Sequence, residues 1–295
     1  MKQLQAEMVL EHVAALGEGA LWDDRAGRLL WVDIPMGEIH AFDPATGQDR
    51  LLYQSGSQIG TVVQREKGGL LAATDKGLVF IDEQTGTVQS ICNPEQDKQQ
   101  NRFNDGKCGP DGRFWAGTMA GGPGSEGQGS LYRLDADLSC HRVLEGVTIS
   151  NGIAWNPDGN TMYYTDTPTR QIWAFDYDQK TGCITNRRTV VEIAPGEGGP
   201  DGFTVDAEGM LWVAQWGGWQ VARYDPATGN KITKVNVPAG QVTSCAFGGK
   251  QLDTLFITTA SVGLSKADQE NQPLAGCLFK ADAGVVGMRA CRFFG

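Results

Sequence analysis

Four short motifs carry the side chains best suited to chemistry, each an acidic or amide residue followed by glycine. They are Glu18-Gly19, Asp105-Gly106, Asn151-Gly152 and Asp201-Gly202. Their side chains offer only oxygen ligands, which hard cations such as Ca²⁺, Mg²⁺ and Mn²⁺ prefer. Carboxylates gathered at one point repel one another and lose hydration, and a divalent cation offsets both costs. The motifs therefore predict a metal site if the fold brings them together. The alternative is that they are polar turn residues beside a required glycine.

The motifs recur because the chain is a sixfold repeat. Each repeat opens with a short apolar strand, and the motifs stand just before these strands, which are expected at Ala20, Val62, Lys107, Ile153, Phe203 and Cys245. The spacings are 42, 45, 46, 50 and 42 residues, with a mean of 45. A turn cluster follows each strand: DDRAG, REKG, GPDG, NPDG, DAEG and FGGK. Such glycine, aspartate and proline clusters reverse a chain tightly. The pattern predicts a strand, a turn and a second strand in every repeat.

Three further strands are predicted in each repeat from runs of β-branched and aromatic residues. The second strands are LLWVDI, LLAATD, FWAGTM, TMYYTD, LWVAQW and TLFITT. The third are IHAFD, LVFID, LYRLD, IWAFD, VARYD and LFKAD, and the fourth are RLLYQ, VQSIC, CHRVL, RTVVE, ITKVN and MRACR. Four strands at a period near 45 residues are typical of a propeller blade. We predict an all-β, six-bladed β-propeller that occupies residues 1–295 as a single domain. A solenoid is the rival, but distinct polar capping repeats are missing.

Ring closure and the channel follow from this architecture. The segment Glu7 to His12 occupies the place of a fourth strand before the first blade. We expect it to pair near the last blade and fasten the ring. The first strand of each blade lines the central channel. Glu18, Asn151 and Asp201 are therefore expected to converge at one mouth, where three protein ligands leave positions open for water and substrate.

Residues that recur in every blade are interpreted as scaffold. An aspartate ends each third strand and is expected to form an Asx-type turn with its own backbone; these are Asp43, Asp82, Asp135, Asp176, Asp225 and Asp282. Tryptophans in first and second strands are expected to pack between neighbouring blades; these are Trp22, Trp31, Trp115, Trp155 and Trp212.

Composition excludes several classes of protein. The net charge is −10, the pI is about 4.8, and no run of Lys or Arg could follow a phosphate backbone, so nucleic acid is not an expected partner. No apolar stretch approaches the roughly 20 residues of a membrane helix. The first residues, MKQLQAEMVLEHV, lack the features of a signal peptide, which predicts a cytoplasmic protein. A monomer or weak homo-oligomer is expected.

Cysteine and histidine usage adds two expectations. The seven Cys form no CxxC pair and are expected to be reduced, acting mainly as small buried hydrophobes. The three His are His12, His40 and His141, and none lies within a few residues of another. The chain therefore has no local signature of a His-rich zinc site.

Four ordered blocks resemble the senescence-marker-protein/gluconolactonase/regucalcin family across essentially the whole chain. They are LGEGALWD with LLWVDIP, NRFNDGKCGPDGRFWAGTM, SNGIAWNPDGNTMYYTD and GPDGFTVDAEGMLWVAQW. The resemblance implies a six-bladed propeller with one catalytic divalent ion that hydrolyses sugar lactones. It leaves the ion open among Ca²⁺, Zn²⁺, Mn²⁺, Mg²⁺ and Fe²⁺.

The resemblance also assigns roles to residues. It implies that Glu18, Asn151 and Asp201 hold the metal and that Asp201 also acts as the general base. It implies that Arg102 and Asn104 contact the substrate, with Asn104 also near the metal. The repeat alignment instead places Asp105 in the ligand position, and Asp105 is retained as a supporting residue.

One departure from the family concerns the substrate. Animal members carry a glutamate shortly after GTM that contacts the sugar, whereas this chain has Gly121 and Gly122 there. Glu126, in the same segment, is the candidate substitute.

The predicted activity is metal-dependent opening of an aldonolactone to the acid. The ion polarises the carbonyl, and a water activated by Asp201 or by the ion itself attacks it. Two alternatives remain at this point. The same site could act on phosphotriesters or aryl esters, or the chain could be a non-catalytic calcium-binding regulatory protein.

Overall fold

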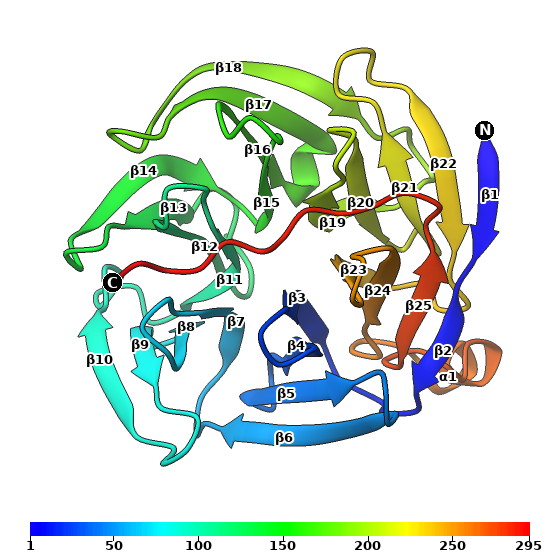
Figure 1. The fold of residues 1–295 in the computed structure, drawn as a ribbon, viewed down its shortest axis with the longest axis horizontal. Coiled ribbons are helices and arrows are strands. Elements are labelled where there is room, and N and C mark those ends of the chain that lie inside the picture. The colour runs from blue at the N-terminus through cyan, green and yellow to red at the C-terminus, as the bar shows by residue number, and fades with distance from the viewer.

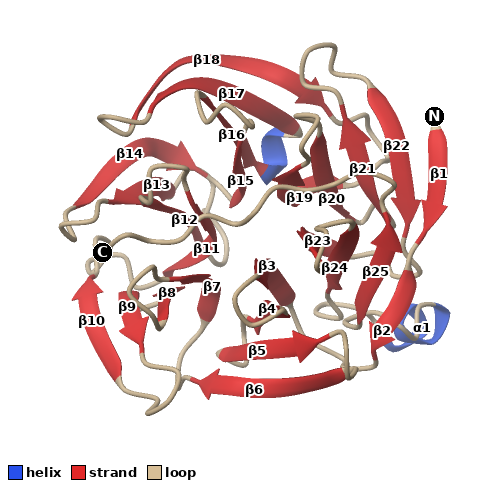
Figure 2. Cartoon of the chain, in the orientation of Figure 1, coloured by secondary structure: helices blue, strands red, loops and turns tan.

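Six antiparallel sheets stand around a common axis like the blades of a propeller (Figures 1 and 2). The computed structural model describes all 295 residues. The six-bladed all-β fold predicted from the repeat is thus confirmed. The first strands of successive blades are neighbours around the axis.

The first three blades each contain four consecutive strands. Blade one has β3 (Gly17–Asp23), β4 (Arg28–Asp33), β5 (Glu38–Asp43) and β6 (Gln48–Gln54). Blade two has β7 (Ile59–Gln64), β8 (Leu70–Thr74), β9 (Gly77–Ile81) and β10 (Val88–Cys92). Blade three has β11 (Asn101–Cys108), β12 (Phe114–Ala120), β13 (Gly129–Leu134) and β14 (Cys140–Val147).

Blade four also contains four consecutive strands, whereas blades five and six each include a strand from the N-terminus. Blade four has β15 (Ser150–Trp155), β16 (Thr161–Asp166), β17 (Gln171–Asp178) and β18 (Cys183–Glu192). Blade five has β19 (Gly199–Val205), β20 (Leu211–Trp216), β21 (Gln220–Tyr224) and β22 (Lys231–Asn236), with β1 (Lys2–Gln5) added at its edge. Blade six has β23 (Val242–Gly248), β24 (Thr254–Thr259) and β25 (Leu278–Asp282), and its fourth strand is β2 (Glu7–Leu10).

The two chain ends together close the ring. Strand β2 pairs antiparallel with β25, which confirms that the segment after Glu7 fastens the last blade. In addition, β1 pairs parallel with β22, so blade five has five strands. The sequence pattern did not predict this extra strand.

The predicted fourth strand MRACR of blade six is wrong. Because β2 already occupies the edge of β25, residues 283–295 leave the sheet and cross the ring (Figure 1, red). Along this path the Ala207 amide of blade five donates to the Val286 carbonyl at 2.9 Å. The Phe294 amide donates to the Gly112 carbonyl of blade three at 3.1 Å. The Phe293 amide donates to Gln64 in blade two at 2.9 Å, and the Phe293 side chain is fully buried.

Burial decreases from the axis outward. Every residue of β3, β7, β15 and β23 is buried, whereas most of β18 is exposed. The tryptophans pack between blades as predicted: Trp22 stacks on Phe256 of blade six at 5.6 Å between ring centroids, and Trp115 meets Trp155 of blade four at 6.3 Å.

The repeated aspartates form Asx turns in four of the six blades. Asp43, Asp82, Asp225 and Asp282 each accept from the backbone amide two residues on. The interpretation is wrong for Asp135 and Asp176, whose carboxylates pair with nearby arginines instead. Arg113 and Arg133 donate to Asp135, and Arg188 on the neighbouring strand β18 donates to Asp176.

Helical structure is confined to η1 (Thr167–Thr169) and α1 (Lys266–Asn271). Neither is long or apolar enough to cross a membrane. All seven cysteines are free thiols. The expectation of burial holds for Cys108, Cys245 and Cys277, whereas Cys183 is exposed.

Candidate metal centre and substrate cavity

A β-bulge interrupts every first strand at the level of the acidic and amide motifs. The pairing register shifts between Glu18 and Leu21 in β3, Phe103 and Gly106 in β11, Asn151 and Ile153 in β15, and Pro200 and Phe203 in β19. The motif residues therefore lie within the first strands. The repeat alignment placed them just before these strands, and that placement is wrong. A bulge leaves a residue unpaired and redirects its side chain. Asn104 and Asp201 are unpaired residues of their bulges, whereas Glu18 and Asn151 are the last paired residues before theirs.

The residues Glu18, Arg102, Asn104, Asn151 and Asp201 line one cavity of about 200 Å³. They come from blades one, three, four and five, so side chains far apart in the sequence meet as predicted. The side chains of Glu18, Asn104, Asn151 and Asp201 are all buried, and Arg102 is partly exposed. The rest of the wall is mainly apolar, formed by Leu16, Met119, Ile149, Thr167 and Trp216.

Two carboxylates share this cavity without a cationic side chain bonded to either. Burial and the nearby Asp105 carboxylate raise the pKa of Glu18 to about 8. Burial, reinforced by Glu18 and Asp105, raises the pKa of Asp201 well above its ordinary value. The Oδ1 atom of Asp201 is buried and has no hydrogen-bond partner. An unpartnered carboxylate oxygen beside a second carboxylate and an amide oxygen fits a hard divalent cation.

The amides of the site belong to a chain of hydrogen bonds that spans three blades. Arg102 donates to Asn104 Oδ1 at 2.6 Å, and Asn104 Nδ2 donates to Asn151 Oδ1 at 3.1 Å and to the Ser150 carbonyl at 2.8 Å. Asn151 Nδ2 then donates to Thr167 Oγ1 at 2.9 Å. Thr167 in turn donates to the Pro200 carbonyl at 2.8 Å, next to Asp201. This chain fixes which way each amide oxygen points.

Asp105 lies beside the cavity but does not line it. Its Oδ1 accepts from the Gly106 amide at 2.7 Å, and burial raises its pKa. The neighbouring Lys107 is half-buried, and its Nζ donates to the Phe203 carbonyl at 2.7 Å. Of the two neighbours weighed from sequence, Asn104 faces the cavity and Asp105 stands behind it.

Glu126 is placed away from the cavity. It is exposed in the segment between β12 and β13, close to the equally exposed Gly121 and Gly122. Near the GTM motif the cavity wall is formed by Met119, an apolar side chain.

Sequence reasoning missed Thr167, Met119 and Trp216 as cavity residues. Thr167 directly follows the predicted strand TMYYTD, and Trp216 ends LWVAQW. Both lie where a second strand returns to the motif end of its blade. That position was a usable signal, because the antiparallel partner of a first strand must end at the same mouth.

Comparison with known proteins agrees with this architecture. Residues 16–261 match the family model described as the SMP-30/gluconolactonase/LRE-like region. The chain is 40% identical over 282 residues, 96% of each chain, to a Bacillus subtilis protein named "Putative sugar lactone lactonase YvrE". It is 37% identical to Xenopus laevis regucalcin over 300 residues, covering 100% of both chains.

A solved structure is similarly close. The calcium-binding protein regucalcin from Agrobacterium tumefaciens superposes with a TM-score of 0.93 at 30% identity, covering 99% of this chain and 98% of that one. The chain therefore belongs to the SMP-30/gluconolactonase/LRE-like family.

Proposed function

We propose that the chain is a metal-dependent lactonase that opens a sugar lactone, an aldonolactone of five or six carbons, to its acid. The observation that carries the proposal is the buried pair Glu18 and Asp201, with one Asp201 oxygen lacking a partner, at the wall of one cavity. The 40% identity to a protein named as a sugar lactone lactonase supports the substrate class.

Glu18, Asn151 and Asp201 would hold the ion, with Asn104 beside them. A bound divalent cation supplies polarisation of the lactone carbonyl and stabilises the negative charge that develops on its oxygen. An all-oxygen set accommodates Ca²⁺, Mg²⁺ or Mn²⁺.

Asp201 is the proposed general base. A water adds to the lactone carbonyl carbon as its proton passes to the Asp201 carboxylate. The bond from that carbon to the ring oxygen then breaks, and Asp201 returns the proton to the ring oxygen, which becomes a hydroxyl. The products are the open-chain acid and the regenerated carboxylate.

Arg102 is the proposed substrate anchor. A guanidinium has five N–H donors, and the NH1 group of Arg102 donates to Asn104 and to the Phe103 carbonyl. The remaining donors can bind substrate hydroxyls or the ring oxygen. The apolar surface of Met119 and Trp216 faces the same space and suits the carbon face of a sugar ring.

Metal removal tests the proposal. The purified chain is treated with a chelator, and hydrolysis of aldonolactones is compared before treatment, after treatment and after each divalent ion is restored. We expect loss of activity on removal and recovery with at least one ion. Full activity in the metal-free chain would contradict the proposal.

A substrate panel separates the alternatives. A phosphotriester and an aryl ester are measured beside the lactones, and relative kcat/KM identifies the preferred class. A non-catalytic calcium-binding protein would bind Ca²⁺ but hydrolyse none of the three.

A further inference from the structure

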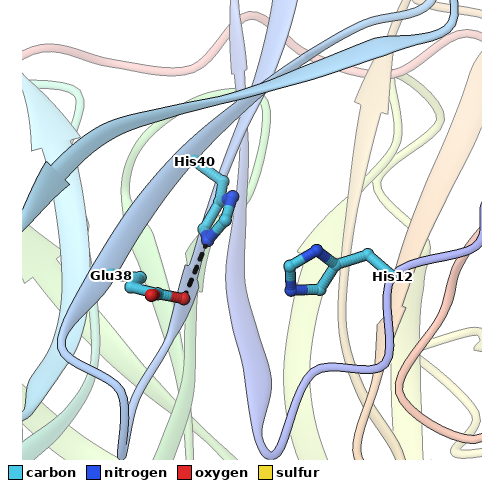
Figure 3. Close-up of side chains that lie close together, drawn as sticks. All are labelled: His12, Glu38 and His40. Atoms are coloured by element: carbon cyan, nitrogen blue, oxygen red, sulfur yellow. Dashed lines mark hydrogen bonds and ion pairs between the residues drawn. The ribbon is translucent and has the colours of Figure 1, made fainter.

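Two histidines that are remote in sequence meet on the outer side of blade one. His12 lies in the segment that links β2 to β3, whereas His40 and Glu38 lie on β5. One donor atom from each of the three side chains lies within 4.8 Å of the other two. Figure 3 shows the three side chains pointing towards one another. Residues two apart on a strand share a face, which explains why Glu38 and His40 point together.

The His40 ring is held in a fixed orientation by two half-buried carboxylates and a buried indole. Its Nδ1 is 2.6 Å from Asp49 Oδ2, and its other nitrogen, Nε2, is 3.2 Å from Glu38 Oε2. Asp49 is fixed in turn by the Trp31 indole, which donates to Oδ1 at 3.0 Å. The Trp31 ring also stacks on His40 at 4.2 Å between centroids. A carboxylate on one imidazole nitrogen is the usual outer partner of a metal-binding histidine, whose other nitrogen binds the ion.

Glu38 and His12 complete the cluster in different ways. Glu38 Oε1 accepts from Gln54 at 3.0 Å, which leaves Oε2 directed at the histidines. Neither ring nitrogen of His12 makes a hydrogen bond, although its ring centroid lies only 5.0 Å from that of His40. A proton on His40 would satisfy Glu38 and Asp49 but would leave the half-buried His12 without a protein partner. A metal ion satisfies all three side chains at once.

We propose that His12, Glu38 and His40 form a second metal site, distinct from the channel, that takes Zn²⁺ or a similar imidazole-binding ion. Two imidazoles and one carboxylate are a common zinc ligand set, and the fourth position is open to water. The channel residues offer only oxygen, so the two sites differ in the ions that they prefer.

The site joins the two ends of the ring. His12 follows β2, the strand that completes blade six, and Ala14 in the same segment donates to Gly276 of that blade at 3.1 Å. Glu38 and His40 belong to blade one. A bound ion therefore cross-links the closing segment to the first blade and stabilises the closed ring.

Zinc titration of the full chain tests this site. The channel is first disabled in a Glu18→Gln, Asp201→Asn parent, which is stripped with chelator and titrated with Zn²⁺ by calorimetry. We expect one equivalent to bind and the Tm to rise with zinc concentration. His12→Asn in this parent should abolish both effects, and Asp49→Asn should weaken binding by about 10–100-fold.

Matched controls make the result decisive. His141→Asn removes a half-exposed histidine outside the cluster and should bind zinc like the parent. His12→Asn should match the parent's Tm without metal, and if it fails to fold, Glu38→Gln replaces it. Absence of zinc binding in the parent, or unchanged binding in His12→Asn, would overturn the proposal. In the otherwise unchanged chain, His12→Asn should retain lactone hydrolysis, which separates this proposal from the proposed function.

Discussion

Asp201 and Glu18 oppose folding when no cation neutralises them. Both are buried, and the Oδ1 atom of Asp201 has no hydrogen-bond partner. Burial and mutual repulsion raise the pKa of both carboxyls, so without a cation they either take up protons or stay charged, and each outcome costs free energy that the rest of the propeller must offset. Residues that are needed for chemistry often carry such a cost in stability.

Asp201→Asn should therefore separate activity from stability. It removes the proposed base, so we expect kcat/KM for lactones to fall by about 10²–10⁴-fold. It also removes one of two repelling charges, so the chelator-treated variant should be more stable than the unchanged chain by about 1 kcal/mol. Rate assays and chemical denaturation measure the two effects. Asp225→Asn, at an exposed turn, is the control, and a destabilised Asp201→Asn would argue against the repulsion.

Thr167 is a positioning residue that acts through Asn151. Its hydroxyl accepts from the Asn151 amide and donates to the Pro200 carbonyl. Thr167→Val leaves both groups unpartnered, and Asn151 can then rotate its oxygen away from the cavity. We expect kcat to fall about tenfold with weaker binding of the metal, consistent with the roughly 1–3 kcal/mol cost of an unsatisfied buried group. Thr167→Ser keeps the hydroxyl and should restore both values. Equal metal affinity in the Val and Ser variants would contradict this role.

At the scale of the element, the regular strands were predictable and the irregular ones were not. The runs TMYYTD, LWVAQW, TLFITT and LFKAD coincide with β16, β20, β24 and β25, because apolar runs bounded by turn residues leave little choice of register. The bulges were missed because the glycine beside each motif fits a tight turn as well as a bulge. The strand β1 was missed because its pairing partner, β22, is more than 200 residues away.

The candidate site was likewise predictable only in part. The convergence of Glu18, Asn151 and Asp201 followed from the repeat alone, since equivalent positions in each blade must meet near the axis. The choice between Asn104 and Asp105 could not be made from the repeat, because the bulge between Phe103 and Gly106 decides which of the two faces the cavity. The meeting of His12 with His40 depends on the path of the closing segment, which no periodicity encodes.

In five of the six blades a glycine lies within or at the end of the bulge, where a side chain would crowd a neighbouring strand. In blade two, which contributes no polar site residue, a Cβ on Gly60 would lie 2.3 Å from the Phe103 carbonyl oxygen and 2.5 Å from that of Asn104. Gly60→Ala must therefore displace β11, and with it Asn104 and Arg102. We expect a loss of about 1–3 kcal/mol in stability and a clear fall in kcat/KM.

The control for this prediction is Gly56→Ala. A Cβ at Gly56 meets nothing within 4 Å, so this variant should keep both stability and activity. Unaltered activity in Gly60→Ala would show that the site does not depend on the packing of β7 against β11.

At the scale of the molecule, the two chain ends stabilise the ring by different means. The N-terminal strands β1 and β2 add to sheets, whereas residues 283–295 cross the ring and contact blades two, three, five and six. With β2 closing the ring, we propose that the whole chain unfolds as one cooperative unit. The crossing segment also lines a second cavity of about 100 Å³. Its Met288, Arg289, Ala290 and Cys291 face the ends of the first strands that lie away from the motifs.

Phe293 is the anchor of this crossing segment, and its removal should affect stability without affecting catalysis. Its side chain is fully buried against blade two, 6.1 Å from Phe80 between ring centroids, and the Glu66 amide donates to its carbonyl at 2.8 Å. Phe293→Ala should lower the free energy of unfolding by about 3–5 kcal/mol, the usual cost of emptying such a site. The adjacent Phe294 is 49% exposed, so Phe294→Ala should cost far less. Because Phe293 does not line the Glu18 cavity, kcat and KM for lactones should match those of the unchanged chain at temperatures where the variant is folded. Denaturant unfolding of both variants measures the change in stability, and steady-state kinetics measure kcat and KM. A loss of activity without a loss of stability would mean that the crossing segment acts on the metal centre and does not simply hold the ring together.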